Sequence, residues 1–258
     1  MALYPHVLYR APITLFWVWI NLLPFNINNQ CRPLAIVEDR INKPWRTMPS
    51  GRLSARQAKY SMILFYHVAI LTSWMIGGLR PSLALIILGF WYNRLGGADS
   101  NGFVRNLINA LGFTCFGIGS LELTLNQEIS FDLKGFDDLM MWIFVVATVV
   151  LTTVHVQDMS DQVGDALINR KSLPLQIGDG PARWSIIGFM SLWSVFCPYF
   201  WRCGWFGYTI STPLATLVSY RSYKYRTAQS DKITYQIWNI WMASLYFLPL
   251  IGRKAEVV

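Results

Sequence analysis

Charged residues are scarce in this chain. Asp, Glu, Lys and Arg together make up 14% of its 258 residues, whereas a soluble domain normally carries about 25%. The net charge is +8, but the cations are interleaved with hydrophobic segments instead of gathering on one polar face. This distribution argues against nucleic acid as a partner and predicts a protein built for a lipid environment.

Cysteine and histidine are also few. The four cysteines contain no Cys-x-x-Cys pair, and the three histidines are scattered along the chain. Neither a zinc site nor a disulfide framework is therefore predicted. Residues 1–9 lack a charged segment and a small-residue cleavage site, so no cleaved signal peptide is expected.

Hydrophobic residues make up 53% of the chain and fall into eight segments. A membrane-spanning helix needs about 20 apolar residues, and most segments reach that length, although 81–95 is short. No repeat or long linker separates domains, so the sequence predicts one all-α integral membrane domain over residues 1–258, with about eight transmembrane helices. The segments run over 11–30, 57–78, 81–95, 103–125, 137–157, 183–201, 203–220 and 233–252.

The distribution of basic residues predicts which end of the bundle faces the cytoplasm. If the eight segments alternate in direction, most of the 22 Lys and Arg residues fall in loops on one side of the membrane. Basic loops favour the cytoplasmic side, so this side is expected to be cytoplasmic. An acidic loop over residues 128–138 falls on the opposite side, in agreement with that orientation.

Three carboxylates follow the fifth hydrophobic segment, in the stretch Asp158-Met-Ser-Asp161-Gln-Val-Gly164-Asp165. If the helix continues, spacings of three and seven residues place all three on one face. Like charges at a membrane boundary repel one another, and a divalent cation that takes oxygen ligands, best Mg2+, would relieve the repulsion. Basic residues follow at Arg170 and Lys171. Together these residues indicate a binding site for a phosphate or diphosphate. The alternative is a solvated acidic helix end.

The first cytoplasmic loop carries the other dense polar cluster. Pro33 has no N–H to donate to the carbonyl of Asn29, so the first span is expected to kink or end there. Glu38 and Asp39 supply further oxygen donors, and three cations follow at Lys43, Arg46 and Arg52. A positive-inside loop with a helix stop is the simpler interpretation, but the second polar cluster on the same side favours a shared site.

Together the two clusters resemble the UbiA superfamily of intramembrane prenyltransferases. In that family an Asn- and Asp-rich motif leads into an Asn-Lys-Pro-x-Arg-Pro-x-Pro-Ser-Gly-Arg loop, and an Asp-x-x-Asp-x-x-Gly-Asp motif leads into a basic segment with Leu-Pro. This chain has Asn42-Lys-Pro-Trp-Arg-Thr-Met-Pro-Ser-Gly-Arg52 and, after the three carboxylates, Arg170-Lys-Ser-Leu-Pro174. The order, the separation and the cytoplasmic location agree, and the match covers nearly the whole chain.

The first motif departs from the transferase pattern. Transferases of the family have Asn-xxx-Asp-xxx-Asp before the loop, and here the first two of these positions hold Cys31 and Ala35. The pair Asn29-Gln30 followed by Glu38-Asp39 is similar instead to the fungal UbiA-type terpene cyclases. The family typically has nine spans, one of them before this motif, so the resemblance also implies that the first helix is lacking here.

The resemblance implies a membrane-bound terpene cyclase whose helices surround a central cavity open to the cytoplasmic side. It would ionise a prenyl diphosphate with Mg2+, farnesyl diphosphate being favoured over geranylgeranyl diphosphate, and cyclise the allylic cation in terpenoid secondary metabolism. The expected catalytic residues and metal ligands are five carboxylates: Asp158, Asp161, Asp165, Glu38 and Asp39. The expected diphosphate-binding residues are Asn29, Lys43, Arg46, Arg170 and Lys171.

An allylic cation would also need a dry cavity with aromatic walls, where a well-placed ring contributes about 2 kcal/mol. The rings that could line it, unless they face lipid, are Trp17, Trp19, Tyr66, Trp91, Tyr92, Phe113 and Phe116. Other polar residues in or near the spans are open to both functional and structural interpretations: Arg105, Asn106, Asn109, Glu122 and His155.

Two alternatives remain open. A UbiA-type prenyltransferase would pass the prenyl group to an aromatic or other acceptor, and it would need a second pocket. A cation-linked transporter would place charged residues near the bilayer midplane, whereas the acidic residues here gather at one edge. In each case a multi-pass membrane protein is expected, in the endoplasmic reticulum if the source is eukaryotic, with both motifs facing the cytoplasm. The sequence identifies no protein partner.

Overall fold

The computed structural model describes residues 5–129 and 138–252, and every regular element in these ranges is helical. Each of the eight hydrophobic segments coincides with one long helix, so the all-helical fold class is confirmed. The long helices are α1 (Pro5–Gln30), α3 (Ala55–Ile76), α4 (Leu79–Asn93), α6 (Gly102–Leu125), α7 (Asp138–Thr153), α10 (Asp179–Phe200), α11 (Gly204–Lys224) and α12 (Ala228–Leu245).

Two helical stretches within the described ranges combine the length and the apolar composition of a membrane span, namely Gly102–Leu125 and Asp138–Ser160. The expected number of about eight membrane crossings therefore stays a prediction. Residues 130–137, which hold most of the acidic loop used to orient the bundle, lie outside the described residues, as do the terminal segments 1–4 and 253–258.

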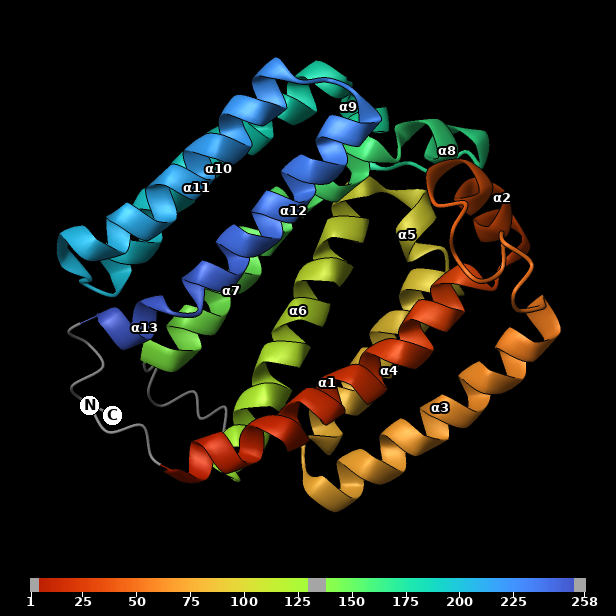
Figure 1. The fold of residues 1–258 in the computed structure, drawn as a ribbon, viewed down its shortest axis with the longest axis horizontal. Helices are drawn as coiled ribbons and strands as arrows, with labels where there is room; N and C mark the ends of the chain where they lie inside the picture. Colours follow the sequence, from red (N-terminus) through yellow and green to blue (C-terminus); the bar gives the residue numbers. More distant parts are fainter. Residues whose placement is uncertain (1–4, 130–137, 253–258) are drawn as a thin grey trace.

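Four short helices gather at one end of the long ones (Figure 1): α2 (Pro33–Asn42), α5 (Gly97–Ser100), α8 (Gln162–Leu167) and α9 (Leu173–Ile177). A 3-10 helix, η1 (Val154–Ser160), leads from α7 toward α8, and α2 packs against α8. The remaining short helix, α13 (Leu248–Ile251), lies at the other end of the bundle. The short helices thus carry both polar motifs to the end that the sequence assigns to the cytoplasm.

The boundary between α1 and α2 follows from the proline chemistry of the first motif. Helix α1 ends at Gln30, and α2 begins at Pro33, with Arg32 in extended backbone conformation just before it. Proline is favoured in the first turn of a helix because its missing N–H would have no partner there. The predicted helix end at Pro33 is confirmed.

The second motif does not continue the preceding α-helix, so the predicted single face of carboxylates is wrong. Helix α7 ends at Thr153, η1 carries Asp158, and Asp161 stands between η1 and α8 with non-helical backbone angles. The Thr153 hydroxyl donates to the carbonyl of Val149 one turn earlier, a contact that often bends helices. The three carboxylates consequently point to separate partners.

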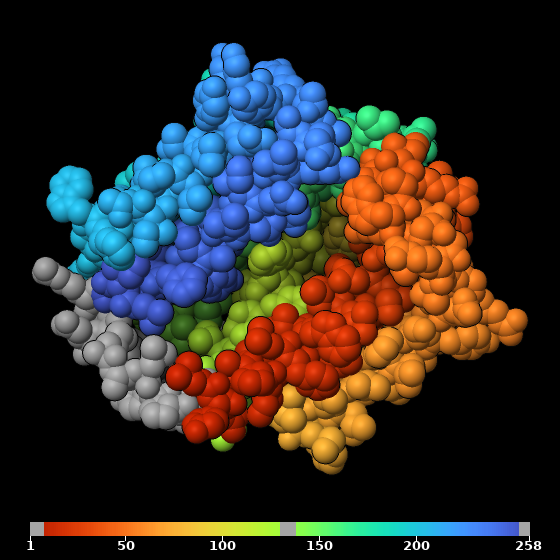
Figure 2. All heavy atoms as spheres, in the orientation of Figure 1, coloured from red at the N-terminus to blue at the C-terminus, as the bar shows by residue number. Residues whose placement is uncertain are grey.

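The two halves of the bundle are packed differently. Helices α7, α10, α11 and α12, with η1, enclose a large hydrophobic core that contains the fully buried side chains of Trp238, Trp241, Ile186 and Met190. Helices α4, α5 and α6 hold a much smaller buried cluster of Tyr92, Ala98 and Ile108, against which Phe25 of α1 packs. Figure 2 shows α6 between α1 and α12, at the floor of a hollow in this face of the molecule.

Candidate active site

The two sequence motifs meet through the side chain of Asn42. Its amide nitrogen donates to the carbonyl of Asp161 at 3.0 Å, and its amide oxygen accepts the N–H of Gly164 at 3.3 Å. A Cβ atom at Gly164 would lie only 2.3 Å from the Asn42 amide nitrogen. Glycine is needed here because the amide of the first motif lies directly on the backbone of the second.

Each of the five predicted metal-ligand carboxylates is paired with a cation of the protein. These groups are almost fully buried, and buried charges require such partners. The carboxylate–cation pairs, with their N–O distances, are Asp158 with Arg105 at 2.9 Å, Asp39 with Arg46 at 2.8 Å, Asp165 with Arg170 at 2.9 Å, Glu38 with Arg170 at 2.8 Å, and Asp161 with Lys43. The structure therefore describes a closed ion-pair network.

A polar cavity of about 30 Å³ lies inside this network. Seven of the ten predicted site residues line it, and Asp158 and Asp165 stand behind Arg105 and Arg170. By the same measure one water molecule needs about 10–15 Å³, so the cavity has room for a few water molecules and the ion pairs would have to separate before a diphosphate entered. The lining residues are Asn29, Ala35, Glu38, Asp39, Lys43, Arg46, Tyr92, Arg105, Asp161 and Arg170.

Lys171 is not part of the cavity lining. Its side chain is exposed, and its backbone N–H donates to the carbonyl of Asp99 at 2.9 Å. The turn after α8 directs Arg170 inward, so its neighbour Lys171 faces solvent. In this conformation the side chain of Lys171 does not contact the site, so its expected role in diphosphate binding stays a prediction.

Asp99 belongs to the network but was not expected from the sequence. It accepts hydrogen bonds from Arg32 and from Arg170, both at 2.8 Å. Burial alone would raise the pKa of Asp99, but these two hydrogen bonds outweigh burial and lower it. Asp99 lies in a short turn with no diagnostic spacing to either motif, so its place on the predicted cytoplasmic side was the only available signal.

Burial changes the acid–base behaviour of the second motif. It raises the pKa of the Asp165 carboxyl to about 7, although Arg105 and Arg170 oppose the rise. One oxygen of Asp165, Oδ2, and one nitrogen of Arg105, Nη1, are buried without a hydrogen-bond partner among the described residues. Because neither atom is exposed, each could bind a ligand only after the network opened.

The donor chemistry of the site fits Mg2+, whereas the present arrangement is that of ion pairs. Carboxylate oxygens are the protein ligands that Mg2+ prefers, and Asp165 Oδ2 is free to serve as one. Within residues 5–129 and 138–252, however, no group of three or more His, Cys, Asp or Glu side chains is close enough to hold a metal. A metal would have to replace the Lys and Arg partners of these carboxylates.

An apolar cavity of about 330 Å³ adjoins the polar one, and Tyr92 lines both. It lies among α1, α4 and α6, and its size falls within the range of small-molecule sites. Of the aromatic residues considered from the sequence, Tyr92, Phe113 and Phe116 line it, together with Phe25. Trp17 is instead buried against Gly119, and the side chain of Trp19 is 54% exposed.

Two further polar residues considered from the sequence have structural partners. Glu122 is buried at the other end of the bundle, where it accepts hydrogen bonds from Arg80 at 3.0 Å and from the N–H of Ile129 at 3.1 Å. His155 Nε2 lies 2.9 Å from the hydroxyl of Ser185. Both sets of contacts account for these side chains without catalysis.

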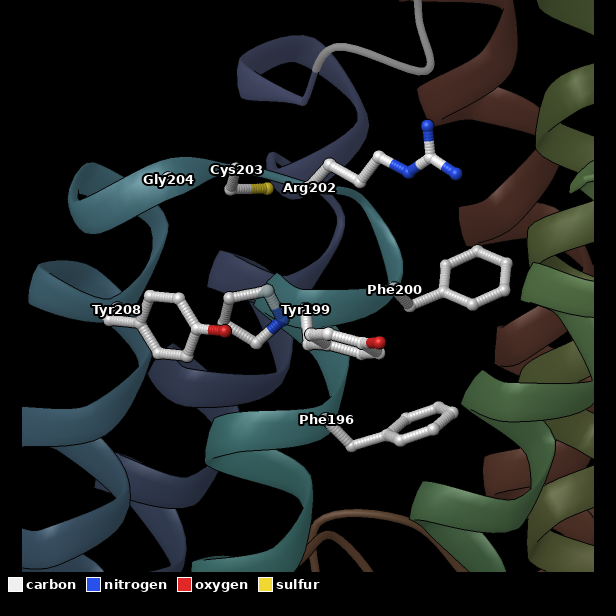
Figure 3. Close-up of a pocket in the computed structure, with 8 residues that line it drawn as sticks. Phe196, Tyr199, Phe200, Arg202, Cys203, Gly204 and Tyr208 are labelled. Atoms are coloured by element: carbon white, nitrogen blue, oxygen red, sulfur yellow. The ribbon is translucent and has the colours of Figure 1, made fainter.

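A separate pocket of about 460 Å³ lies at the turn between α10 and α11, at the end of the bundle opposite the short helices. Figure 3 shows the rings of Phe196, Tyr199 and Phe200 along α10, with Tyr208 of α11 pointing toward Tyr199. Among the described residues, the only charged one that lines it is Arg202. One cation among these residues is fewer than the diphosphate site proposed from the sequence would use.

Known proteins are similar to this chain in both sequence and fold. The model of the UbiA prenyltransferase family matches residues 11–243. The chain belongs to this family. It is therefore a UbiA-family enzyme, a terpene cyclase or a prenyltransferase, and its relatives are intramembrane proteins; the resemblance seen in the motifs is confirmed.

Among the relatives of this UbiA-family enzyme is the fumagillin beta-trans-bergamotene synthase of Aspergillus fumigatus. The two are 27% identical over 250 residues, which cover 92% of this chain and 79% of that protein. The somaliensene A/B synthase of Streptomyces somaliensis is 27% identical over 244 residues, covering 90% of this chain and 78% of that protein. A solved UbiA homologue from Archaeoglobus fulgidus, bound to DMAPP and Mg2+, has the same fold, with a TM-score of 0.61 at 13% identity, covering 91% of this chain and 88% of that chain.

Proposed function

We propose that this chain is a membrane-bound terpene cyclase that ionises a prenyl diphosphate and cyclises the resulting allylic cation, as part of terpenoid secondary metabolism. The observation that carries this proposal is the joining of a cation-rich polar cavity to an aromatic apolar cavity through Tyr92. Such a pair of cavities suits a molecule with a charged head and an apolar tail. Two relatives are named as synthases of terpenes, and a structural relative binds DMAPP with Mg2+.

The diphosphate would lie among Lys43, Arg46, Arg105 and Arg170, with the amide of Asn29 beside them. Charge-assisted hydrogen bonds from these cations stabilise the negative charge that grows on a leaving diphosphate. Arg105 is added to the expected set because its Nη1 is buried and free to donate. Lys171 would join only if the segment after α8 moved inward.

The charge balance of the network favours a divalent cation beside the diphosphate. With Asp99 included, six carboxylates share five protein cations, so the closed network has one surplus negative charge when every carboxylate, including Asp165, is ionised. A diphosphate would enlarge that surplus. Mg2+, when bound by oxygens of Asp158, Asp161, Asp165, Glu38 and Asp39, would offset the charge of the leaving group.

The apolar cavity would hold the prenyl chain and exclude water from the cation. Tyr92, Phe113 and Phe116 line it, and a desolvated aromatic face attracts a cation by about 2 kcal/mol. Farnesyl diphosphate is the favoured substrate, with geranylgeranyl diphosphate as the longer possibility. The shape of the cavity would select the product by folding the chain before ionisation.

A UbiA-type prenyltransferase is the second candidate, because the family takes its name from that reaction. It would use the same ionisation and then give the prenyl group to an aromatic or other acceptor. The altered first motif, with Cys31 and Ala35 at the Asn and Asp positions, favours the cyclase. The transporter alternative has no support, because the chain belongs to an enzyme family.

The cellular setting follows from the basic end of the bundle. We place residues 1–258 in one multi-pass membrane domain, in the endoplasmic reticulum if the source is eukaryotic, with the ion-pair network facing the cytoplasm. The substrate would then enter from the cytoplasmic side, where α2 and α8 meet.

Incubation of membranes that contain the full chain with farnesyl diphosphate and Mg2+, without an acceptor, tests this function. The expected result is release of diphosphate together with a cyclic hydrocarbon, measured by gas chromatography and mass spectrometry. Product that forms only after an aromatic acceptor is added would favour the prenyltransferase. Diphosphate release at the rate of control membranes, with and without acceptors, would refute both candidates.

A further inference from the structure

A second basic cavity lies at the same end of the molecule, outside the ion-pair network. Its volume is about 350 Å³, and it lies where α1 gives way to α2, beside the first turn of α3 and the last residue of α4. None of its lining residues is acidic, and four are Arg or Lys. They are Cys31, Arg32, Pro33, Ala55, Arg56, Lys59 and Arg94.

The cations of this basic cavity have almost no countercharge. One nitrogen of Arg32, Nη1, binds Asp99 at 2.8 Å, but Nε and Nη2 are buried without a partner in the part of the chain that the structure describes. Arg56, Lys59 and Arg94 form no ion pair with any described residue. Arg32 lines the cavity, but these two nitrogens are not exposed to it, so they add positive charge beside the cavity and could donate to a ligand only after the side chain rotated.

Backbone dipoles reinforce the positive charge of the cavity. Pro33 is the first residue of the ten-residue helix α2, and Ala55 and Arg56 open the 22-residue helix α3. The N-terminus of a helix carries a partial positive charge and unpaired N–H groups, which together favour phosphate and other anions. The Ser54 side chain already accepts the Gln57 N–H in a capping box at the start of α3, and Pro33 has no N–H, so the helix dipoles add only a partial positive charge and the four cationic side chains carry the site.

Exposed apolar side chains follow the cavity along the outer surface of α3 and α4. One turn beyond Lys59 on α3, Ile63 and Leu64 are exposed, and one turn before Arg94 on α4, Phe90 is exposed. Helices α3 and α4 pack against each other. A phosphate in the cavity could thus be followed by acyl chains along α3 and α4, an arrangement that suits a phospholipid at the membrane edge.

We propose that this basic cavity is a binding site for a phosphate group, with an anionic phospholipid as its favoured source. Arg32, Lys59 and Arg94 would donate to the phosphate oxygens, and the acyl chains would cover the exposed side chains of α3 and α4. The site is distinct from the polar cavity of the ion-pair network, and the proposal does not depend on the catalytic function.

Native mass spectrometry of the purified full chain in detergent tests the site. The probe is dioleoyl phosphatidic acid, compared with dioleoylglycerol, which has the same acyl chains without the phosphate. The double variant Lys59→Ala with Arg94→Ala should retain about tenfold less phosphatidic acid than the unaltered chain, with no change for dioleoylglycerol. The matched control is Arg40→Ala with Lys224→Ala, which removes the same charge from exposed residues outside the cavity and should bind as the unaltered chain does.

Inorganic phosphate provides the second arm and distinguishes the two sources of the phosphate group. Binding of phosphatidic acid that is lost only in the cavity variant supports a lipid site. Cavity-dependent binding of inorganic phosphate, without preference for phosphatidic acid over dioleoylglycerol, supports the phosphate site and overturns the lipid as its source. Equal losses of phosphatidic acid in both double variants would overturn the cavity as a site, because any basic surface would then suffice.

Discussion

The C-terminal helices of this protein surround a large packed core, whereas the N-terminal helices enclose a cavity. In the C-terminal half, Trp238, Trp241, Ile186 and Met190 are fully buried against one another and their neighbours. In the N-terminal half, tight packing is found at the far end, around Trp17, and a cavity of about 330 Å³ opens toward the ion-pair network. On the function proposed above, the densely packed half would support the site and the half with the cavity would hold the substrate.

Both halves contribute to the ion-pair network, which joins them at one end. Arg105 and Arg46 come from the N-terminal half, and Asp158 and Asp165 from the C-terminal half. The second motif packs against the C-terminal core through η1, and Asn42 of the first motif lies against it. The difference between the two halves can be tested by substitutions in each.

Truncation of the C-terminal core should have the largest effect on stability. Trp238→Ala removes a fully buried indole whose N–H donates to Thr153 at 3.1 Å, and it should lower the unfolding free energy by about 3–5 kcal/mol. Thermal unfolding in detergent, followed by circular dichroism, measures the change. Trp19→Ala, at a side chain 54% exposed on α1, serves as the control and should change stability by less than about 1 kcal/mol. Similar losses in both variants would argue against a distinct C-terminal support.

Removal of a carboxylate from the network should affect activity much more than folding. Asp165→Ala should lower the rate of diphosphate release at least about 100-fold, the usual effect of losing one essential electrostatic group. The fold should persist, because Arg170 keeps its ion pairs with Glu38 and Asp99. Glu128→Ala, at an exposed carboxylate near the other end, should leave the rate unchanged. Near-normal turnover in Asp165→Ala would remove this residue from the site.

The contact between the two motifs can be tested at Gly164. A methyl group there would clash with the Asn42 amide, so Gly164→Ala should destabilise the protein by about 1–3 kcal/mol and reduce turnover. Gly188→Ala on α10 is the control, because a Cβ atom at Gly188 meets open space, and alanine in a helix is slightly stabilising. If both variants melt at the temperature of the unaltered protein, the Asn42–Gly164 contact does not join the motifs.

Reshaping of the apolar cavity should have the smallest effect on stability and a selective effect on products. Phe116→Leu keeps an apolar wall but removes an aromatic face, so we expect a change in product composition and a stability loss under about 1.5 kcal/mol. Gas chromatography of the products measures the first, and thermal unfolding the second. Phe144→Leu, at a side chain 63% exposed on α7, should leave the products unchanged. An identical product profile for Phe116→Leu would place the reacting chain elsewhere.

The long helices and the meeting of the two motifs could be expected from the sequence. Hydrophobic segments of sufficient length mark the helices, and Pro33 marks the end of α1 because its ring removes a backbone donor. That the two motifs lie at the same end of the bundle was predicted by counting basic residues. These features depend on the hydrophobicity, charge and proline content of short segments, which can be read from the sequence.

The pairing inside the site could not be expected, because it depends on contacts between distant segments. The change from α-helix to 3-10 helix after Thr153 accompanies the binding of Asp158 by Arg105 from α6 and of the Asp161 carbonyl by Asn42 from α2. Asp99 enters the network through the packing of α5 against α6. The volume of the apolar cavity likewise results from side chains of three helices, and no single segment encodes it.

Calorimetric titration of the purified chain with inorganic diphosphate, in the presence and absence of Mg2+, tests the central claim most directly. The claim is that the carboxylates exchange their protein cations for a metal while the freed cations bind diphosphate. Mg2+ should then tighten diphosphate binding at least about tenfold, and Asp165→Ala should abolish the enhancement. Equal affinities with and without Mg2+ in the unaltered chain would contradict the exchange and leave the carboxylates as purely structural partners of the arginines.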